Sequence, residues 1–177
     1  MGFYLPAAAV VVLDQITKQV LWRNGEIYSI IDGFLRITLV KNAGAAFGLF
    51  QGARLFFIIA SVVAAIFIIY VAVRLPQADR ARRLYLGLIL GGAIGNLIDR
   101  TLFGEVIDFI EIGFMGHYWP VFNVADMGVS IGAVLLLLFL LRHPSEPAAV
   151  PATDGAEVVD GGQAVGAPAD PTTPRDG

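Results

Sequence analysis

Polar connections separate four long apolar segments along the chain, and the second of these holds no charged residue between Arg54 and Arg74. A helix of about 20 apolar residues crosses a hydrocarbon core of about 30 Å. The pattern therefore predicts an all-α membrane protein with four transmembrane helices. The segments are residues 3–22, 55–73, 84–98 and 121–141.

The first segment differs from the others because polar residues interrupt its second half. Asp14 and Lys18 stand four residues apart, so they can pair on one face of a helix, and we interpret them as a structural pair. No basic residue precedes the segment and no small-residue cleavage site follows it. We therefore expect it to be retained as a helix rather than removed as a signal peptide.

Two of the connections partly alternate between apolar and polar positions, as is typical of a β-strand. They cover residues 34–41 and 104–113. We expect these strands to pair in a small extramembrane β-element on the outer side of the membrane. Small residues at 42–48 suit a backbone that approaches another group closely, although an ordinary turn explains them as well.

Four arginines between the second and third apolar segments set the predicted orientation. They form the densest basic cluster of the chain, and connections rich in Lys and Arg remain in the cytoplasm. With four crossings, both chain ends are then cytoplasmic, and residues 23–54 and 101–119 are external. The four are Arg74, Arg80, Arg82 and Arg83.

The composition indicates one membrane domain followed by a tail. The 177 residues are 56% hydrophobic, and the mean hydropathy of +0.72 is well above that of soluble proteins. From residue 143 onward, Pro, Ala, Gly and acidic residues dominate, and such a composition cannot bury a core. We predict a transmembrane domain over residues 1–142 and a disordered cytoplasmic tail over residues 143–177.

Charge and residue types exclude several classes of function. The net charge is −3 and no basic stripe is present, which argues against a nucleic-acid partner. The absence of cysteine excludes disulfides, thiolate metal sites and a Cys nucleophile. His117 and His143 lack a metal-ligand spacing, and the serines have no His or Lys partner nearby in the sequence. Carboxylates with asparagines could still hold Mg²⁺ or Ca²⁺.

Polar residues gather around the end of the third segment and the start of the fourth. Ionisable groups are costly within a membrane and indicate a functional site there. At a rise of about 1.5 Å per residue, the polar positions of the helices and of the two external connections reach one level near the outer membrane surface. The group comprises Asn96, Asp99, Arg100, Asp108, Asn123 and Asp126, joined at that level by Asp14, Lys18 and Asn42.

Carboxylates that meet in a medium of low dielectric constant cannot all ionise, so two of them can share one proton. The ionised member then activates water, and the protonated member donates to the scissile carbonyl group. An aspartyl peptidase is therefore a chemistry that this set can perform. The spacing leaves open which two of Asp14, Asp99, Asp108 and Asp126 form the pair.

Five short blocks together resemble lipoprotein signal peptidase (signal peptidase II), the bacterial family that removes signal peptides from prolipoproteins. Their order along the chain matches the family, and they extend over most of residues 10–130. The blocks are 14–18 (DQITK), 41–47 (KNAGAAF), 95–100 (GNLIDR), 106–109 (VIDF) and 122–126 (FNVAD).

The resemblance implies an aspartyl protease of the bacterial inner membrane without a cofactor or metal, whose active site lies at the outer face. It implies catalytic roles for Asp108 and Asp126. The substrate would be a prolipoprotein cut just before its diacylglyceryl-modified cysteine, and the protein would contact membrane lipids and act as a monomer. The substrate-binding positions implied are Asn42, Gly44, Asn96, Arg100 and Asn123, and the structural ones are Asp14, Lys18 and Asp99.

Two other classes compete with a peptidase on the residues alone. A proton-coupled transporter or channel also keeps carboxylates in the membrane, but it favours polar residues through the full depth and an internal repeat. Residues 55–73 are nearly free of polar groups, and the two halves of the chain show no repeat. A non-catalytic scaffold leaves the polar cluster without a purpose, and a presenilin-like protease would need a Gly-x-Gly-Asp motif that is absent.

Overall fold

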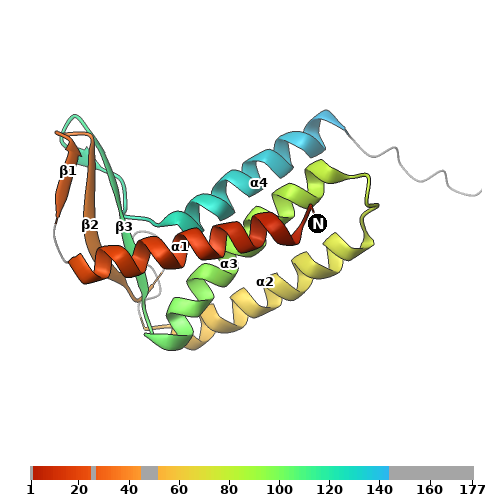
Figure 1. Cartoon of the computed structure of the whole chain (residues 1–177), viewed down its shortest axis with the longest axis horizontal. Helices are drawn as coiled ribbons and strands as arrows, with labels where there is room; N and C mark the ends of the chain where they lie inside the picture. Colours follow the sequence, from red (N-terminus) through yellow and green to blue (C-terminus); the bar gives the residue numbers. More distant parts are fainter. Residues whose placement is uncertain (1, 25–26, 45–51, 144–177) are drawn as a thin grey trace, which may run out of the picture. The chain divides into compact units, whose positions relative to one another are not determined.

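The computed structural model describes residues 2–24, 27–44 and 52–143, in which a bundle of helices carries a small sheet at one end (Figure 1). The predicted tail lies outside these residues apart from His143. The helices are α1 (Tyr4–Asn24), α2 (Arg54–Arg74), α3 (Arg80–Leu102) and α4 (Val124–Arg142). The strands are β1 (Tyr28–Ile31), β2 (Leu35–Asn42), β3 (Val106–Phe114) and β4 (His117–Tyr118).

Each predicted apolar segment forms a helix, but α3 is longer than predicted at both ends. It begins at Arg80 because the Asp79 side chain accepts the backbone N–H of Arg82 at 3.2 Å and so caps the first turn. Buried Arg83 is also accommodated, since its Nη1 donates to the carbonyl groups of Ala72 at 2.9 Å and Leu75 at 3.2 Å. The basic connection therefore continues as helix, with the Arg83 guanidinium group bonded to the end of α2 and Arg82 paired with Asp79.

Two of the helices, α2 and α4, are long and apolar enough to cross a membrane by length and composition. Within the described residues, α1 and α3 do not pass the same test. Both of them carry buried charged groups, namely Asp14 and Lys18 on α1 and Asp99 on α3. The protein is thus mostly helical with a small antiparallel sheet and two clear candidate membrane helices.

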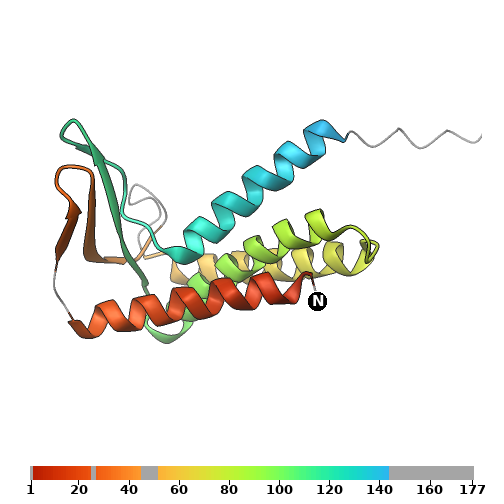
Figure 2. The same cartoon turned by 45° about the horizontal axis from the view of Figure 1, so that its top comes forward.

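Helix α3 is central, because it contacts each of the other three helices (Figures 1 and 2). Its glycines make the close approach possible. A Cβ atom on Gly92 would lie 2.1 Å from the Ala125 carbonyl oxygen of α4, and one on Gly95 would lie 2.8 Å from Asp14 Oδ2 of α1. Because these glycines have no side chain, α1 and α4 can lie close to α3, and the polar residues of the three helices come together.

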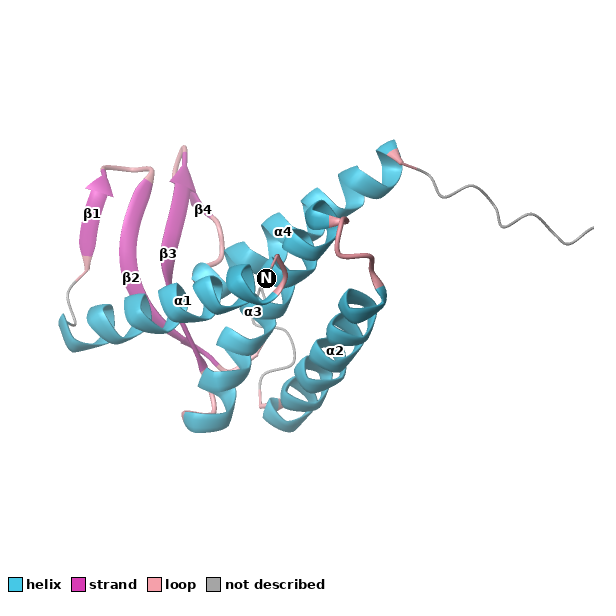
Figure 3. Ribbon diagram, turned by 45° about the vertical axis from the view of Figure 1, so that its right-hand side comes forward, coloured by secondary structure: helices cyan, strands magenta, loops and turns pink. Residues whose placement is uncertain are grey.

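The sheet is antiparallel in the order β1-β2-β3-β4 and lies beyond one end of the helices (Figure 3). The predicted pairing of the two longer strands is confirmed, with Val40 opposite Asp108 and Asn42 opposite Val106. Strands β1 and β4 were not predicted; they are short, and their residues are exposed.

The segment before α4 is also attached to the sheet. Phe122 and Ile110 form an isolated antiparallel bridge, with backbone N···O distances of 3.0 and 2.8 Å. Helix α4 therefore starts at Val124 rather than at the predicted residue 121. This bridge ties the start of α4 directly to β3.

Candidate active site

Asp108 and Asp126 face one site from different elements, Asp108 from β3 and Asp126 from the first turn of α4. Asp108 is only 2% exposed, whereas Asp126 is half-buried. Both line a cavity of about 680 Å³ that opens between the sheet and the helices. Asn42, Gly44, Asn96 and Arg100 line the same cavity.

Asn123 connects the two aspartates. Its Nδ2 donates to Asp108 Oδ1 at 2.7 Å, and its Oδ1 accepts the backbone N–H of Asp126 at 2.9 Å. The Asp126 carboxylate in turn accepts the backbone N–H of Asn123 at 3.2 Å. This reciprocal arrangement is a capping box, so the start of α4 and the position of Asp126 are determined together.

Two further asparagines complete the hydrogen bonds of the carboxylates. Asn42 Nδ2 donates to the second oxygen of Asp108 at 2.9 Å, and Asn96 Nδ2 donates to Asp126 Oδ1 at 2.7 Å. Asn96 Oδ1 also accepts from Asn123 Nδ2 at 3.0 Å. Each carboxylate is therefore oriented by amide donors.

Arg100 holds the first residues of the loop that follows β2. Its Nη2 donates to the Gly44 carbonyl oxygen at 3.2 Å, and Gly44 N–H donates to Asn42 Oδ1 at 3.0 Å. The guanidinium group lies over the Phe57 ring, 4.9 Å from its centroid. Residues 45–48 of the 42–48 stretch lie outside the described residues. The predicted close approach of this backbone to another group can therefore be checked only at residues 42–44, where Arg100 contacts the Gly44 carbonyl oxygen.

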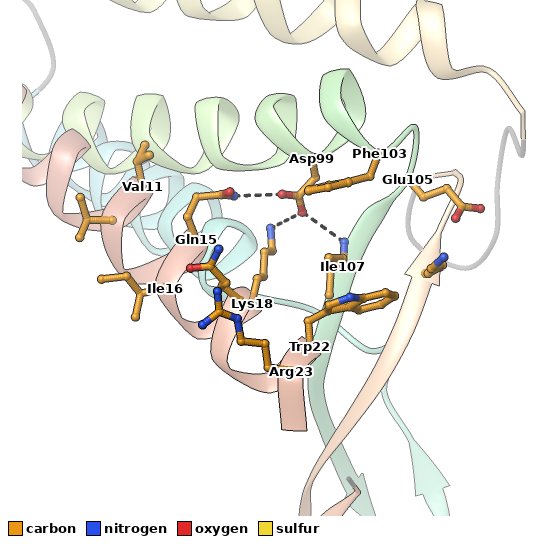
Figure 4. Close-up of a pocket in the computed structure, with 13 residues that line it drawn as sticks. Val11, Gln15, Ile16, Lys18, Trp22, Arg23, Asp99, Phe103, Glu105 and Ile107 are labelled. Atoms are coloured by element: carbon orange, nitrogen blue, oxygen red, sulfur yellow. Dashed lines mark hydrogen bonds and ion pairs between the residues drawn. The ribbon is translucent and has the colours of Figure 1, made fainter. Parts of the chain in front are cut away.

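A buried ion cluster lies behind the two aspartates. Lys18 Nζ is 2.7 Å from Asp14 Oδ2 and 2.7 Å from Asp99 Oδ2, and all three side chains are at most 3% exposed. Gln15 Nε2 donates to Asp14 at 3.1 Å and to Asp99 at 2.9 Å (Figure 4). The predicted pairing of Asp14 with Lys18 is confirmed, and Asp99 joins it.

The same cluster holds the backbone beside each aspartate of the site. Asp14 Oδ1 accepts the N–H of Ala125 at 2.9 Å, and Asp99 Oδ2 accepts the N–H of Ile107 at 3.2 Å. Ala125 directly precedes one aspartate of the site, and Ile107 directly precedes the other. Helices α1 and α3 therefore position the two segments on which the site is built.

Burial is the largest influence on the ionisation of Asp108 and raises its pKa to about 6. The hydrogen bond from Asn42 opposes this, the negative charge of Asp126 adds to it, and Asn123 and Lys18 oppose it more weakly. A carboxyl group with this pKa can hold or release a proton near neutral pH. Asp126 adds a second carboxylate to the same cavity, and two carboxylates on one cavity can supply a general acid and a general base.

The structure brings all the polar residues predicted for the site into one network. It separates them into a pair that opens onto the cavity, Asp108 and Asp126, and a buried ion cluster. Among the described residues, no group of three or more His, Cys, Asp or Glu side chains is placed to bind a metal ion.

Sequence reasoning assigned no role to two residues that support the site. Gln15 bonds to both carboxylates of the ion cluster, and its only signal was a polar side chain in an apolar segment. Arg54 donates from Nε to the Arg100 carbonyl oxygen at 2.8 Å and from Nη2 to the Thr101 carbonyl oxygen at 2.9 Å. It thereby satisfies the last turn of α3, a contact between distant segments that no local pattern indicates.

Comparison with known proteins gives one consistent result. Residues 6–142 match the family model described as signal peptidase (SPase) II. The chain is 42% identical over 143 residues to the lipoprotein signal peptidase of Listeria monocytogenes serotype 4b, covering 79% of this chain and 93% of the relative. It is 37% identical over 144 residues to the lipoprotein signal peptidase of Staphylococcus aureus, covering 80% and 88%. A solved bacterial membrane enzyme at 37% identity superposes with a TM-score of 0.74 over 80% of this chain and 88% of that one.

Proposed function

Because the chain belongs to the signal peptidase II family, we propose that it is an aspartic endopeptidase that uses Asp108 and Asp126 to cleave prolipoproteins. The family match confirms the resemblance recognised in the five sequence blocks, and members of this family remove signal peptides from prolipoproteins. The aspartic mechanism and the roles of individual residues are our proposal. The observation that carries it is the pair of carboxylates joined by Asn123 on one cavity.

In the proposed reaction the two carboxylates share one proton. Because the pKa of Asp108 is raised to about 6, we assign the shared proton to Asp108, and Asp126 then accepts a proton from the attacking water. Asp108 donates to the oxygen of the scissile carbonyl, and a tetrahedral intermediate forms. Asp126 then gives its proton to the amide nitrogen, and Asp108 takes back its proton from the hydroxyl group of the intermediate as the carbonyl re-forms. The C–N bond breaks, and the signal peptide is released with a new C-terminal carboxyl group.

The remaining polar residues of the cavity would bind and orient the substrate. Asn42, Asn96 and Asn123 hold the carboxylates in place. The amide groups of Asn42 and Asn96 line the cavity where the peptide would lie, whereas Asn123 is fully buried and would act on the substrate only through the aspartates. Arg100 and Gly44 form one side of that space. The ion cluster of Asp14, Lys18 and Asp99 would have a structural role, because it contacts the backbone beside the pair rather than the cavity that holds it.

The proposed topology has four membrane-crossing helices and places the sheet and the active site at the outer face of the bacterial inner membrane. Both termini are then cytoplasmic. Helices α1 and α3 can cross despite their charges because these charges are paired inside the bundle. The substrate would be a prolipoprotein whose cysteine already carries diacylglycerol, since this lipid would hold the scissile bond at the membrane surface. We propose that the enzyme acts as a monomer among membrane lipids and needs no cofactor.

Cleavage by the purified full-length protein in lipid bilayers tests the proposal. Lipidated prolipoprotein should release its signal peptide, the unlipidated form should react far less, and a chelator should have no effect. Asp108→Asn and Asp126→Asn keep the shape and remove the ionisable group, so each should nearly abolish release. The double variant should be little worse than either single one, because the two groups act together.

Asp32→Asn is the matched control, since Asp32 is exposed in the turn between β1 and β2 and contacts only Ser29 among the described side chains. It should cleave at the wild-type rate. Substantial cleavage by either Asp108→Asn or Asp126→Asn, measured on equal amounts of inserted protein, would contradict the aspartic mechanism. Loss of activity on chelation would contradict it as well.

A further inference from the structure

A second cavity of about 550 Å³ is lined by residues of α1, the end of α3 and β3 (Figure 4). Among the described residues, it shares no lining residue with the cavity that contains Asp108 and Asp126. Helix α1 forms one wall, the end of α3 with Phe103 forms another, and Ile107 of β3 contributes to the remainder. A molecule bound here would therefore not be the peptide undergoing cleavage.

The cavity changes character along α1. Val11 and Ile16 line its inner part, whereas Trp22 and Arg23 line its outer end. Val11 and Arg23 are twelve residues apart, which corresponds to roughly 18 Å along a helix. One leaflet contributes about half of a hydrocarbon core of about 30 Å. The cavity thus has the length and the polarity gradient of a lipid that stands in one leaflet.

Three of the polar side chains that line the cavity, those of Gln15, Lys18 and Asp99, already have partners. Asp99 accepts hydrogen bonds from Gln15 at 2.9 Å and from Ile107 N–H at 3.2 Å, and it forms the ion pair with Lys18 at 2.7 Å. An acyl chain that covers them would therefore not strip them of hydrogen bonds. An acyl chain can therefore lie against this part of the cavity, because the polar groups there bond to one another.

Two basic residues at the outer end make no ion pair within the described part of the chain. Arg23 is exposed, and Lys41 Nζ lies over the Trp22 ring, 5.1 Å from its centroid. Glu105 is the acidic residue on the rim, and Figure 4 shows it apart from Arg23. The three charged residues of the rim, Arg23, Lys41 and Glu105, together carry one net positive charge. They lie next to Trp22, a residue type that is enriched at membrane interfaces.

We propose that this cavity binds an anionic glycerophospholipid, with its phosphate at Arg23 and Lys41 and one acyl chain along Val11 and Ile16. The proposal rests on the proposed function only for the topology that places this end of α1 at the outer leaflet. The lipid is a bound neighbour of the enzyme and takes no part in the reaction.

Fluorescence quenching of Trp22 measures binding at this cavity directly. The chain has two tryptophans, so Trp119→Phe leaves Trp22 as the single reporter in the full-length protein. The protein is placed in phosphatidylcholine bilayers that contain a small fraction of brominated phosphatidylglycerol or of brominated phosphatidylcholine. A basic residue near the membrane surface changes the affinity for an anionic lipid roughly fivefold. We therefore expect brominated phosphatidylglycerol to quench Trp22 at a mole fraction at least fivefold lower than brominated phosphatidylcholine does.

The double change Arg23→Gln and Lys41→Gln should remove this preference. Arg74→Gln is a control for charge at another place, because it deletes one positive charge beside an aromatic ring, Tyr70, at the far end of the bundle. It should retain the preference. High salt should weaken the preference for phosphatidylglycerol in the protein that retains Arg23 and Lys41, because salt screens exposed charges.

Equal quenching of Trp22 by the two brominated lipids in the Trp119→Phe protein would refute the proposal, and this result does not depend on the folding of the glutamine variants. An equal loss of preference in Arg74→Gln would refute it too, since the attraction would then not be local. The same measurement on Asp126→Asn separates the two proposals. That variant should lose cleavage and keep the lipid preference.

Discussion

Asp108→Asn should stabilise the folded protein at alkaline pH while it removes activity. Asp108 is 2% exposed, and its pKa is raised from 3.8 to about 6, with burial as the main cause. A carboxyl group with a higher pKa in the folded state favours folding below pH 3.8, and this contribution is lost as the pH rises through about 6. The shift of about two units at about 1.4 kcal/mol each gives a penalty of about 3 kcal/mol at pH 8 and about 1 kcal/mol at pH 4.5.

The asparagine also loses a hydrogen bond. Asp108 accepts from two amide donors, Asn42 at 2.9 Å and Asn123 at 2.7 Å, but an asparagine side chain has a single acceptor oxygen. One donor would then face an NH₂ group, at a cost of about 1–2 kcal/mol. The free energy of unfolding of Asp108→Asn should therefore exceed that of the wild type by about 1–2 kcal/mol at pH 8, and this advantage should vanish near pH 4.5.

Equilibrium unfolding in detergent, followed by tryptophan fluorescence at the two pH values, measures this difference. Asp32→Asn serves as the control, because Asp32 is exposed and its substitution should change stability little at either pH. A less stable Asp108→Asn protein at pH 8, or a difference that does not change with pH, would refute the reasoning. Either result would mean that burial does not destabilise the ionised form of Asp108.

Three other changes test the network and the topology. Lys18→Met leaves two buried carboxylates without their cation, so unfolding measurements should show a loss of about 3–5 kcal/mol, and a loss below 1 kcal/mol would contradict the role of the ion cluster. Arg100→Lys should lower the cleavage rate in folded protein, because a point charge does not replace a planar fork of donors, and wild-type turnover would remove this residue from the site. Cysteines introduced at the exposed positions Gln77 and His117 should react with impermeant reagents from the cytoplasmic and outer sides respectively, and labelling of both from one side would contradict four crossings.

The sequence alone determined the features that depend on local patterns. The long apolar runs predicted the four helices, because the length and apolar character of a run indicate a helix whatever that helix packs against. The alternation in residues 34–41 and 104–113 gave the two strands that pair. The spacing of Asp14 and Lys18 gave their ion pair, and the motif blocks gave the family.

Only the tertiary structure gave a physical reason to distinguish among the four aspartates. From charge positions and helix rise alone, Asp14, Asp99, Asp108 and Asp126 are equivalent carboxylates at one level, and only the family resemblance implied that Asp108 and Asp126 form the pair. The fold places Asp14 and Asp99 on either side of Lys18 and leaves Asp108 and Asp126 to amide donors beside a cavity.

The same limit applied to the elements that sequence patterns missed. Strands β1 and β4 are short and exposed, so they carry no apolar periodicity. The start of α4 depends on Asn123 and on the bridge between Phe122 and Ile110. Strands β1 and β4 are held by backbone hydrogen bonds to the neighbouring strands β2 and β3, which no side-chain pattern indicates. The start of α4 also depends on contacts with β3 and α1, which form only once these elements have packed.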